Sequence, residues 1–518
     1  MNADPDSLDS STPYEIGQDN VQVMGLDVHN PVFWISTLTV FLFVLCTLIF
    51  QTEAAALFGA VRSWITTRLD WLFLISVNVF LLICLYLIIS PLGRIRIGGP
   101  SAETHYSYPS WFAMMFAAGV GIGLMFYGVL EPVTHTLAPP LNIEPGSDQA
   151  NAGLGVATAT FHWGLHAWAI YALVGLSLAV FHYNKGLPLT IRSAFYPLLG
   201  ERIWGWPGHI IDILAVFATL FGLATSLGLG AQQTAAGLNY VFGISNDSTT
   251  HVVVILGITV VAMFSVVRGM DRGVKILSEI NMAIAAALLL FVIVAGPTLS
   301  ILGGMLENTV HYLRYLPALS NWIGREDTVF LHDWTIFYWA WWISWSPFVG
   351  MFMARVSHGR TVREFLISAL LVPTSAGLIW MTAFGGTAIE QYLGNGYTEV
   401  VDAVQSSGVE LALFKFLQAL PFAEVTSVIA IVLIIVFFVT SMDSGSLVID
   451  TITAGGKIDA PVAQRVFWCT LEGLVAIALM LGGGLAALQA ASLATGFPFV
   501  IVLLLMCVSL FKGLRSET

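Results

Sequence analysis

Aromatic residues are concentrated in two stretches of the chain. Five tryptophans lie among the twelve residues from Trp334 to Trp345, and Trp163, Trp168 and Tyr171 follow one another closely. On a helix that turns by about 100° per residue, Trp163, Trp168 and Tyr171 fall within one half of the helix. Trp341, Trp342 and Trp345 share an arc of about 100° in the same way. Ring faces turned to a common cavity attract a cation without N–H donors, and quaternary ammonium is the cation that aromatic cages recognise. A tryptophan belt at a membrane interface, or ordinary packing, is the alternative.

Glycine occupies alternate positions at Gly119, Gly121 and Gly123. Helices that dimerise through glycines need them four residues apart, so this spacing does not fit a dimerising face. It fits a helix that unwinds inside the membrane and lets a ligand approach its backbone. Close packing against a neighbouring helix is the alternative.

Two histidines, His162 and His166, stand four residues apart. This is the spacing of a zinc-binding pair on a helix. The sequence shows no third ligand near them, so we predict neither a metal site at this pair nor a cofactor.

The composition requires these residues to lie on membrane-spanning helices. Of the 518 residues, 57% are hydrophobic and only 10% are charged, which is outside the range of soluble domains. A hydrocarbon layer about 30 Å thick takes roughly 20 apolar residues per helix. We therefore predict an all-α integral membrane protein. Its twelve transmembrane helices are expected to begin near Pro31, Trp71, Ser110, Leu154, Ile210, Val252, Asn281, Trp334, Val362, Val425, Val462 and Leu488.

Charge predicts the orientation of these helices. Most of the 20 lysines and arginines fall in connections on the same side as the N-terminus, so the positive-inside rule places both termini in the cytoplasm. Residues 1–29 are acidic and contain no Lys or Arg, and we expect a disordered cytoplasmic tail there. Residues 30–511 are expected to form the transmembrane domain, and 512–518 a short cytoplasmic tail. No basic cluster indicates a nucleic-acid partner.

Five motifs resemble, in order, those of the betaine/choline/carnitine transporter family. They are Gly119–Gly128 followed by Glu131 and Pro132, Phe161–Trp168, the tryptophan run Asp333–Phe348, Gly359–Phe365 and Thr440–Gly445. The resemblance covers about residues 31–511. It implies a LeuT-like core of two inverted five-helix repeats, at about 110–306 and 333–511, preceded by two extra helices. It also implies a homotrimer in a bacterial inner membrane.

The resemblance assigns substrate-binding roles to individual residues. The implied cage is Trp163, Trp168, Tyr171 and Trp342, flanked by Trp341 and Trp345, with Trp339 on the inward path. The backbone N–H groups of Gly119, Gly121 and Gly123 would meet the carboxylate of the substrate.

Sodium ligands are implied in the same way. One ion would be held by the carbonyls of Ala117, Val120 and Phe437 and by the hydroxyls of Thr440 and Ser441. Oxygen ligands suit a hard cation, although adjacent Thr and Ser in an apolar helix also bond to their own carbonyls. Thr219 and Phe348 match a second sodium position. Leu223 stands where that position needs another hydroxyl and cannot bind a cation, so the second site is in doubt.

These features predict a secondary active symporter that imports a quaternary-ammonium or sulfonium zwitterion with sodium by alternating access. Glycine betaine and dimethylsulfoniopropionate are examples of such osmoprotective solutes. A proton-coupled choline or carnitine carrier of the same family is the alternative. Family members that carry choline tend to have Asp where this chain has Gly123, which favours a zwitterion here. No HExxH, nucleophile elbow or catalytic carboxylate pair indicates an enzyme, and a channel would need a filter segment or a charged ring.

Overall fold

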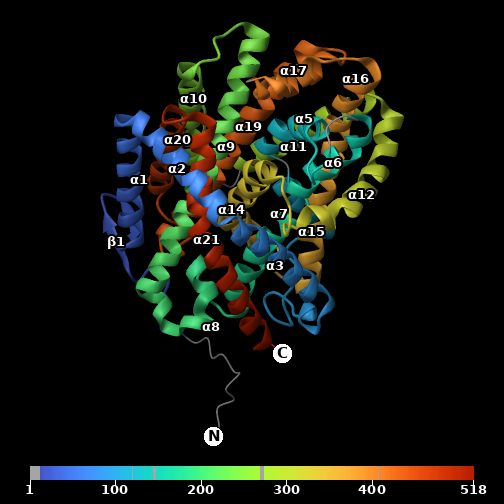
Figure 1. Cartoon of the computed structure of the whole chain (residues 1–518). Helices are drawn as coiled ribbons and strands as arrows, with labels where there is room; N and C mark the ends of the chain where they lie inside the picture. The colour runs from blue at the N-terminus through green and yellow to red at the C-terminus, as the bar shows by residue number, and fades with distance from the viewer. Residues whose placement is uncertain (1–11, 120, 144–147, 269–272, 407, 518) are drawn as a thin grey trace.

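The computed structural model describes residues 12–119, 121–143, 148–268, 273–406 and 408–517. Long helices run through the molecule and shorter ones cover its ends (Figure 1). Two strands, β1 (Asn20–Val23) and β2 (Leu26–His29), form an antiparallel hairpin. Apart from one isolated bridge, all other regular structure in the described residues is helical.

The first half of the chain contains the helices α1 to α12, the last of which is long and amphipathic. They are α1 (Val32–Ile49), α2 (Gln51–Arg68), α3 (Asp70–Ile89), α4 (Tyr108–Gly119), α5 (Ile122–Leu137), α6 (Asp148–Trp163), α7 (Leu165–Ala179), α8 (Tyr196–Leu199), α9 (Trp206–Phe242), α10 (Ser248–Arg268), α11 (Gly273–Ala295) and α12 (Thr298–Ser320). The second half contains α13 (Thr328–Phe330), α14 (Ile336–Val356), α15 (Val362–Trp380), α16 (Thr387–Asn395), α17 (Glu399–Gln405), α18 (Ala412–Gln418), α19 (Ala423–Thr453), α20 (Val462–Leu481) and α21 (Gly484–Arg515). Short 3-10 and π segments are η1 (Pro91–Arg94), η2 (Val180–Asn184), η3 (Ile191–Phe195), η4 (Gly200–Trp204), η5 (Leu331–Thr335), η6 (Met381–Gly386) and η7 (Val409–Leu411).

Ten helical stretches among the described residues are long and apolar enough to cross a membrane. They are Val32–Ile49, Asp70–Ile89, Gln149–Asn184, Trp206–Phe242, Ser248–Val267, Leu277–Ala295, Val362–Asn395, Ala423–Thr453, Val462–Leu481 and Gly484–Arg515. Most predicted starts agree with these helices to about one turn. The chain is therefore a helical multi-pass membrane protein, as its composition predicts.

The other two predicted spans differ from these ten for a physical reason. The third is divided into α4 and α5, and each half is too short to cross the hydrocarbon layer alone. The eighth, α14, carries four tryptophans together with serine and proline, which lower its mean hydropathy. Nearly all of α14 is buried, so it does not need a surface suited to lipid. A count of twelve spans in two inverted repeats stays a prediction.

Helix α14 lies at the centre of the molecule (Figure 1). It packs against α7, α9 and α21, while α5 packs against α6, and α9 against α19. The aromatic run therefore lies where the first and second halves of the chain meet.

Residues 12–29 do not form a disordered tail, so this part of the prediction is wrong. The turn of the hairpin uses positive φ at Met24 and Gly25, and Asp27 pairs with Lys457 at 2.5 Å. The acidic composition of this segment predicts disorder. Composition does not reveal binding partners such as Lys457, which lie far along the chain. The remaining residues of the predicted tail, 1–11, lie outside the described residues.

A buried cluster attaches the hairpin to η3 and η4. Tyr14 stacks on Trp204 with ring centroids 3.8 Å apart, and Arg192 pairs with Asp212 at 3.1 Å. Arg192 Nη1 also donates to His29 Nε2 at 3.0 Å. Because a guanidinium only donates, this imidazole nitrogen accepts, and the ring is neutral. Burial and the nearby charge of Arg192 lower the pKa of His29 to about 3.

Tyr14→Ala should loosen the hairpin, because it removes a stacked ring pair of a kind worth about 0.5–1.5 kcal/mol. Hydrogen exchange of residues 20–29 in the purified protein should become faster. Met24→Ala, at a side chain that is 98% exposed, is the matched control. Equal exchange rates in the two variants would contradict the anchoring role of Tyr14.

Candidate functional site

Two helices that border the candidate site are interrupted inside the molecule. The first interruption divides the third predicted span: α4 ends at Gly119, α5 begins at Ile122, and Gly121 is extended at φ −162° and ψ −170°. The chain leaves the helix at the alternate glycines, as their spacing predicts. Val120 lies outside the described residues.

The second interruption, at Gly164, is not predicted by the sequence. Helix α6 ends at Trp163 and α7 begins at Leu165, with Gly164 at φ −105° and ψ −141°. A Cβ at this position would lie 2.5 Å from the carbonyl oxygen of Thr160, so a larger residue would collide with the backbone. The prediction that Trp163 shares one continuous helix with Trp168 and Tyr171 is therefore wrong. Its ring nevertheless reaches the same cavity as the rings of α7.

The structure brings the predicted cage residues together. Ring centroids of Trp163 and Trp342 are 4.8 Å apart with a 72° tilt, and those of Trp168 and Tyr171 are 5.2 Å apart. Tyr171 lies 6.2 Å from Trp342, on which Trp341 stacks at 4.7 Å. All five side chains are buried.

The indole N–H groups of the site are all bound to protein acceptors. The five bonds run from Trp163 to Glu131 Oε2 (3.0 Å), from Trp168 to the carbonyl of Trp163 (3.1 Å), from Trp342 to the carbonyl of His162 (2.8 Å), from Trp341 to Ser226 Oγ (3.2 Å) and from Trp345 to the carbonyl of Gly222 (2.9 Å). Rings whose N–H groups are occupied offer a bound molecule only their carbon faces and edges.

A small cavity of about 50 Å³ lies among these rings. Its lining is Gly121, Ile122, Gly123, Trp163, Ala167, Trp168, Tyr171, Ser226, Trp341, Trp342, Trp345 and Val349. None of these side chains carries a formal charge. Among the predicted residues whose side chains the structure describes, Trp339 does not line it, because it packs against Phe161 and His166 at 5.2 and 5.7 Å between ring centroids. Gly119 is described only as the last residue of α4.

The two glycines that line the cavity have different surroundings. A Cβ at Gly123 would lie 2.3 Å from Trp163 Cη2, whereas a Cβ at Gly121 would meet nothing within 4 Å. Gly123 is thus required for the ring of Trp163 to occupy its place. Gly121 leaves open space beside the unwound backbone.

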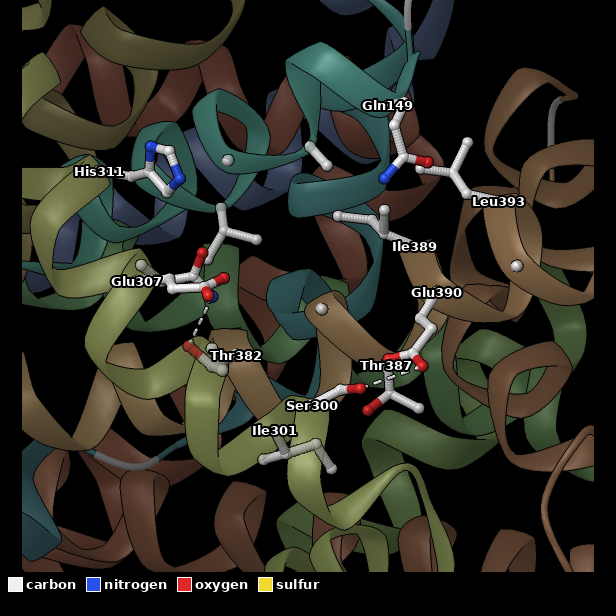
Figure 2. A pocket seen from close by; sticks show the side chains of 17 residues that line it. Gln149, Ser300, Ile301, Glu307, His311, Thr382, Thr387, Ile389, Glu390 and Leu393 are labelled. Atoms are coloured by element: carbon white, nitrogen blue, oxygen red, sulfur yellow. Dashed lines mark hydrogen bonds between the residues drawn. The ribbon is translucent and has the colours of Figure 1, made fainter.

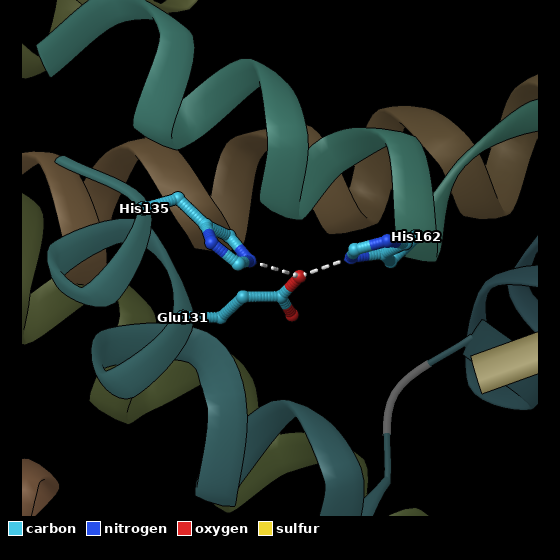
Figure 3. A group of neighbouring side chains, drawn as sticks. All are labelled: Glu131, His135 and His162. Atoms are coloured by element: carbon cyan, nitrogen blue, oxygen red, sulfur yellow. Dashed lines mark hydrogen bonds and ion pairs between the residues drawn. The ribbon is translucent and has the colours of Figure 1, made fainter. Parts of the chain in front are cut away.

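Glu131 lies behind the cage and was not predicted as a site residue. Its Oε2 accepts hydrogen bonds from Trp163 Nε1 at 3.0 Å and from the hydroxyl of Tyr338 at 2.6 Å. Its Oε1 lies 2.5 Å from His162 Nδ1 and 3.4 Å from His135 Nε2 (Figure 3). A carboxylate within a membrane helix is the sequence signal that points to it. It positions two rings of α6 and α14 without lining the cavity.

A larger cavity, about 480 Å³, opens between α6, α12, η6 and α16. Glu307 and His311 of α12 lie on one side of it and Glu390 of α16 on the other (Figure 2). Ser300 Oγ donates to Glu390 at 3.3 Å. No Trp, Tyr or Phe belongs to the residues that line it, so this cavity lacks the chemistry of the predicted cage despite its size.

Comparison with known proteins identifies the family of this chain. The sequence model of the betaine/carnitine/choline family transporters matches residues 31–518. The chain belongs to this family. It is therefore a transporter rather than an enzyme, as the sequence predicts.

Relatives of this family match the chain along most of its length. A glycine betaine/proline/choline transporter of Vibrio parahaemolyticus is 58% identical over 98% of this chain and 94% of the relative. Glycine betaine transporter 1 of the same species is 53% identical, covering 99% and 98%. A glycine betaine transporter of Acinetobacter baylyi is 44% identical, covering 94% and 74%.

Of the positions that the resemblance to the betaine/carnitine/choline family transporters assigns to sodium, Ala117 lies on α4 and Phe437, Thr440 and Ser441 lie on α19; Val120 lies outside the described residues. Thr440 Oγ1 donates to the carbonyls three and four residues earlier, at 3.0 and 3.1 Å, which is the alternative left open by the sequence. The unwound stretch is close to α19, because a Cβ at Gly230 would touch both Ile122 and Phe438. Ser441 is half-buried, and Ala117 is described only as part of α4.

The matching positions of the second sodium site have apolar surroundings. Thr219 Oγ1 donates to the carbonyl of Ala215 at 2.8 Å, and the ring of Phe348 packs edge-on against Trp345. Leu223 Cδ1 would lie 2.2 Å from a Cβ at Gly445. Leucine thus fills the space between α9 and α19 where the family position needs a hydroxyl.

Gly123→Ala should reduce substrate affinity at least several-fold, because its methyl group displaces the ring of Trp163 from the cage. Gly257→Ala, on α10 and with nothing within 4 Å of the added Cβ, is the matched control and should retain nearly normal affinity. Uptake kinetics of both variants, at equal amounts of folded protein, provide the measurement. Unchanged affinity in Gly123→Ala would show that the place of the Trp163 ring does not determine substrate binding.

Proposed function

We propose that this transporter imports a zwitterionic quaternary-ammonium solute of the glycine betaine type, or its sulfonium analogue, together with sodium. The observation that carries the proposal is the set of five tryptophans whose N–H groups are all occupied. Such rings attract a methylated cation through their faces. A ligand that needs hydrogen-bond acceptors for its own N–H groups would find few here.

The other end of the solute is accommodated by the unwound stretch. Helix α5 begins at Ile122, and no side chain caps its N-terminus. Free N–H groups and the helix dipole at such an end favour an anion. Gly121 and Gly123 both line the cavity, so a carboxylate can approach this end closely.

The overall charge of the cavity supports a zwitterion. Its lining holds no Asp, Glu, Lys or Arg, and a net charge taken into such surroundings without a partner is costly. A betaine brings both charges and is neutral as a whole. Choline brings only the cation, and the position of Gly123 offers it no carboxylate.

Alternating access is part of the same proposal, and the close packing of the rings supports it. The cavity among the rings has a volume of about 50 Å³, against about 480 Å³ for the cavity between α6, α12, η6 and α16. We therefore expect the rings to separate when a solute enters. The helices beside the cavity are interrupted between the end of α4 and the start of α5 and at Gly164, and we expect them to bend there.

The coupling ion, assembly and orientation are parts of the same proposal. Sodium would lie between the unwound stretch and α19, at Ala117, Val120, Phe437, Thr440 and Ser441, with Thr440 turning its hydroxyl from its own helix to the ion. The carrier would form a homotrimer in a bacterial inner membrane with both termini in the cytoplasm. One predicted repeat begins with the interrupted span α4–α5 and the other with the aromatic helix α14. Both fit a LeuT-like arrangement of twelve helices.

A second candidate, a choline carrier, is favoured by one finding. The relative that is 58% identical is named a glycine betaine/proline/choline transporter. A cage of this kind also binds the trimethylammonium group of choline. The binding of the two solutes then differs only at the unwound stretch, where the carboxylate of a betaine gains a contact that choline lacks.

Trp342→Ala should weaken betaine affinity by about 1–2 kcal/mol, the value of a desolvated cation–π contact, which is roughly a 5- to 30-fold rise in the half-saturating concentration. Trp64→Ala, in an exposed position on α2, is the control. Unchanged uptake kinetics in Trp342→Ala would remove the cage from the proposal. Competition on the wild type decides between solutes: choline that displaces labelled betaine as well as betaine itself favours the choline carrier.

Thr440→Ala combined with Ser441→Ala should raise the sodium concentration needed for half-maximal uptake, because both hydroxyl ligands are lost. Thr426→Ala removes a hydroxyl of α19 that bonds to its own helix in the same manner, and should leave sodium dependence unchanged. Uptake that ignores sodium but collapses with a protonophore would establish proton coupling instead.

A further inference from the structure

Three buried side chains converge on one point behind the cage. His135 and Glu131 come from α5, and His162 from the last turn of α6 (Figure 3). Glu131 Oε1, His162 Nδ1 and His135 Nε2 all lie within 4.8 Å of one another. The three side chains are at most 1% exposed. His166, which the sequence pairs with His162, instead contacts Asn78 at 3.0 Å.

The hydrogen bonds around this cluster resemble those that orient metal ligands. The second nitrogen of His162 lies 3.0 Å from Thr335 Oγ1, and the second oxygen of Glu131 accepts from Trp163 and Tyr338. Metal-binding imidazoles and carboxylates are oriented by such outer hydrogen bonds. His135 Nε2 has no hydrogen-bond partner although it is buried and directed into the cluster.

We propose that Glu131, His135 and His162 bind Zn²⁺. Two imidazoles and a carboxylate are a known ligand set for zinc with an open fourth position. Tetrahedral zinc, with bonds of about 2.0–2.1 Å, holds its ligand atoms about 3.3 Å apart. The 3.4 Å between Oε1 and His135 Nε2 already fits this distance, while the 2.5 Å to His162 Nδ1 must widen by less than 1 Å.

The charges around the cluster permit the ion. Among the described residues, Arg325 is a cation near the cluster: its guanidinium lies over the ring of Phe330, which packs against His135 and His162. Its Nε donates to Asp327 at 2.8 Å, so a carboxylate offsets its charge. Phe330 and Trp334 cover His135 with ring centroids 5.2 and 4.8 Å away, which separates the bound ion from solvent.

Zinc at this place would slow transport, and this consequence alone rests on the proposed function. The ion would join α5 to the end of α6 between the two interruptions of the backbone. It would also fix Glu131, whose other oxygen holds the rings of Trp163 and Tyr338. A carrier that must separate these rings to admit its solute should therefore be inhibited by micromolar Zn²⁺.

Binding is tested without transport, on the purified full-length protein freed of any affinity tag. Co²⁺ should give the strong visible absorption of a tetrahedral site, and one equivalent of Zn²⁺ should abolish it. His135→Gln should lose this absorption. His166→Gln and His358→Gln should keep it. His358→Gln, the second control, removes one ring of the stacked pair His105 and His358, whose ring centroids lie 4.5 Å apart.

X-ray absorption of the wild-type zinc form keeps the test independent of whether a variant folds. Two imidazoles with oxygen ligands and no sulfur are expected in the first shell. A wild-type protein that gives no tetrahedral Co²⁺ absorption, or keeps it in His135→Gln, would overturn the site and leave a hydrogen-bonded cluster only. Zinc inhibition of uptake that is lost in His135→Gln supports the consequence, whereas binding without inhibition would leave the site and remove its effect on transport.

Discussion

An interrupted helix inside a membrane protein frees backbone groups that water cannot satisfy, and the cage is built around this constraint. Where α6 ends, the carbonyls of His162 and Trp163 accept from the indoles of Trp342 and Trp168 at 2.8 and 3.1 Å. On the other side of the break, Leu165 N–H donates to the hydroxyl of Tyr312 at 3.1 Å. The same bonds that stabilise the break therefore fix the orientation of two cage rings.

Large rings require small residues opposite them. Gly123 leaves room for Trp163, and Gly222 leaves room for Trp345, whose Cδ1 would lie 2.9 Å from a Cβ at that position. Gly350 of α14 lies against the side chain of Val174, 2.6 Å from where its own Cβ would be, so α14 approaches α7 closely. Interiors packed at this density transmit small displacements. A change at any of these glycines should consequently affect the cage even where the glycine does not line it.

The sequence predicts much of this arrangement because several of its features act locally. Alternate glycines predict the first interruption, since no helix face needs that spacing, and apolar length predicts ten of the spans. Gly164 is different: a single glycine in an apolar helix gives no signal, and only the nearby carbonyl of Thr160 shows that no larger residue fits. The order of residues 12–29 was missed for a similar reason, because Asp27 and Tyr14 find partners at Lys457 and Trp204.

The role of Glu131 also depends on contacts with residues that are distant in the sequence. Its carboxylate is separated from Tyr338 by 207 residues, yet accepts a hydrogen bond from the hydroxyl at 2.6 Å. The bond from Trp163 to Glu131 holds the indole in place, so that its ring borders the cavity. The acidic side chain thus stays behind the ring, and the cavity contains no carboxylate from Glu131 that would repel a carboxylate of the solute. A cage with an uncharged lining can in this way favour the ammonium group without rejecting the rest of a zwitterion.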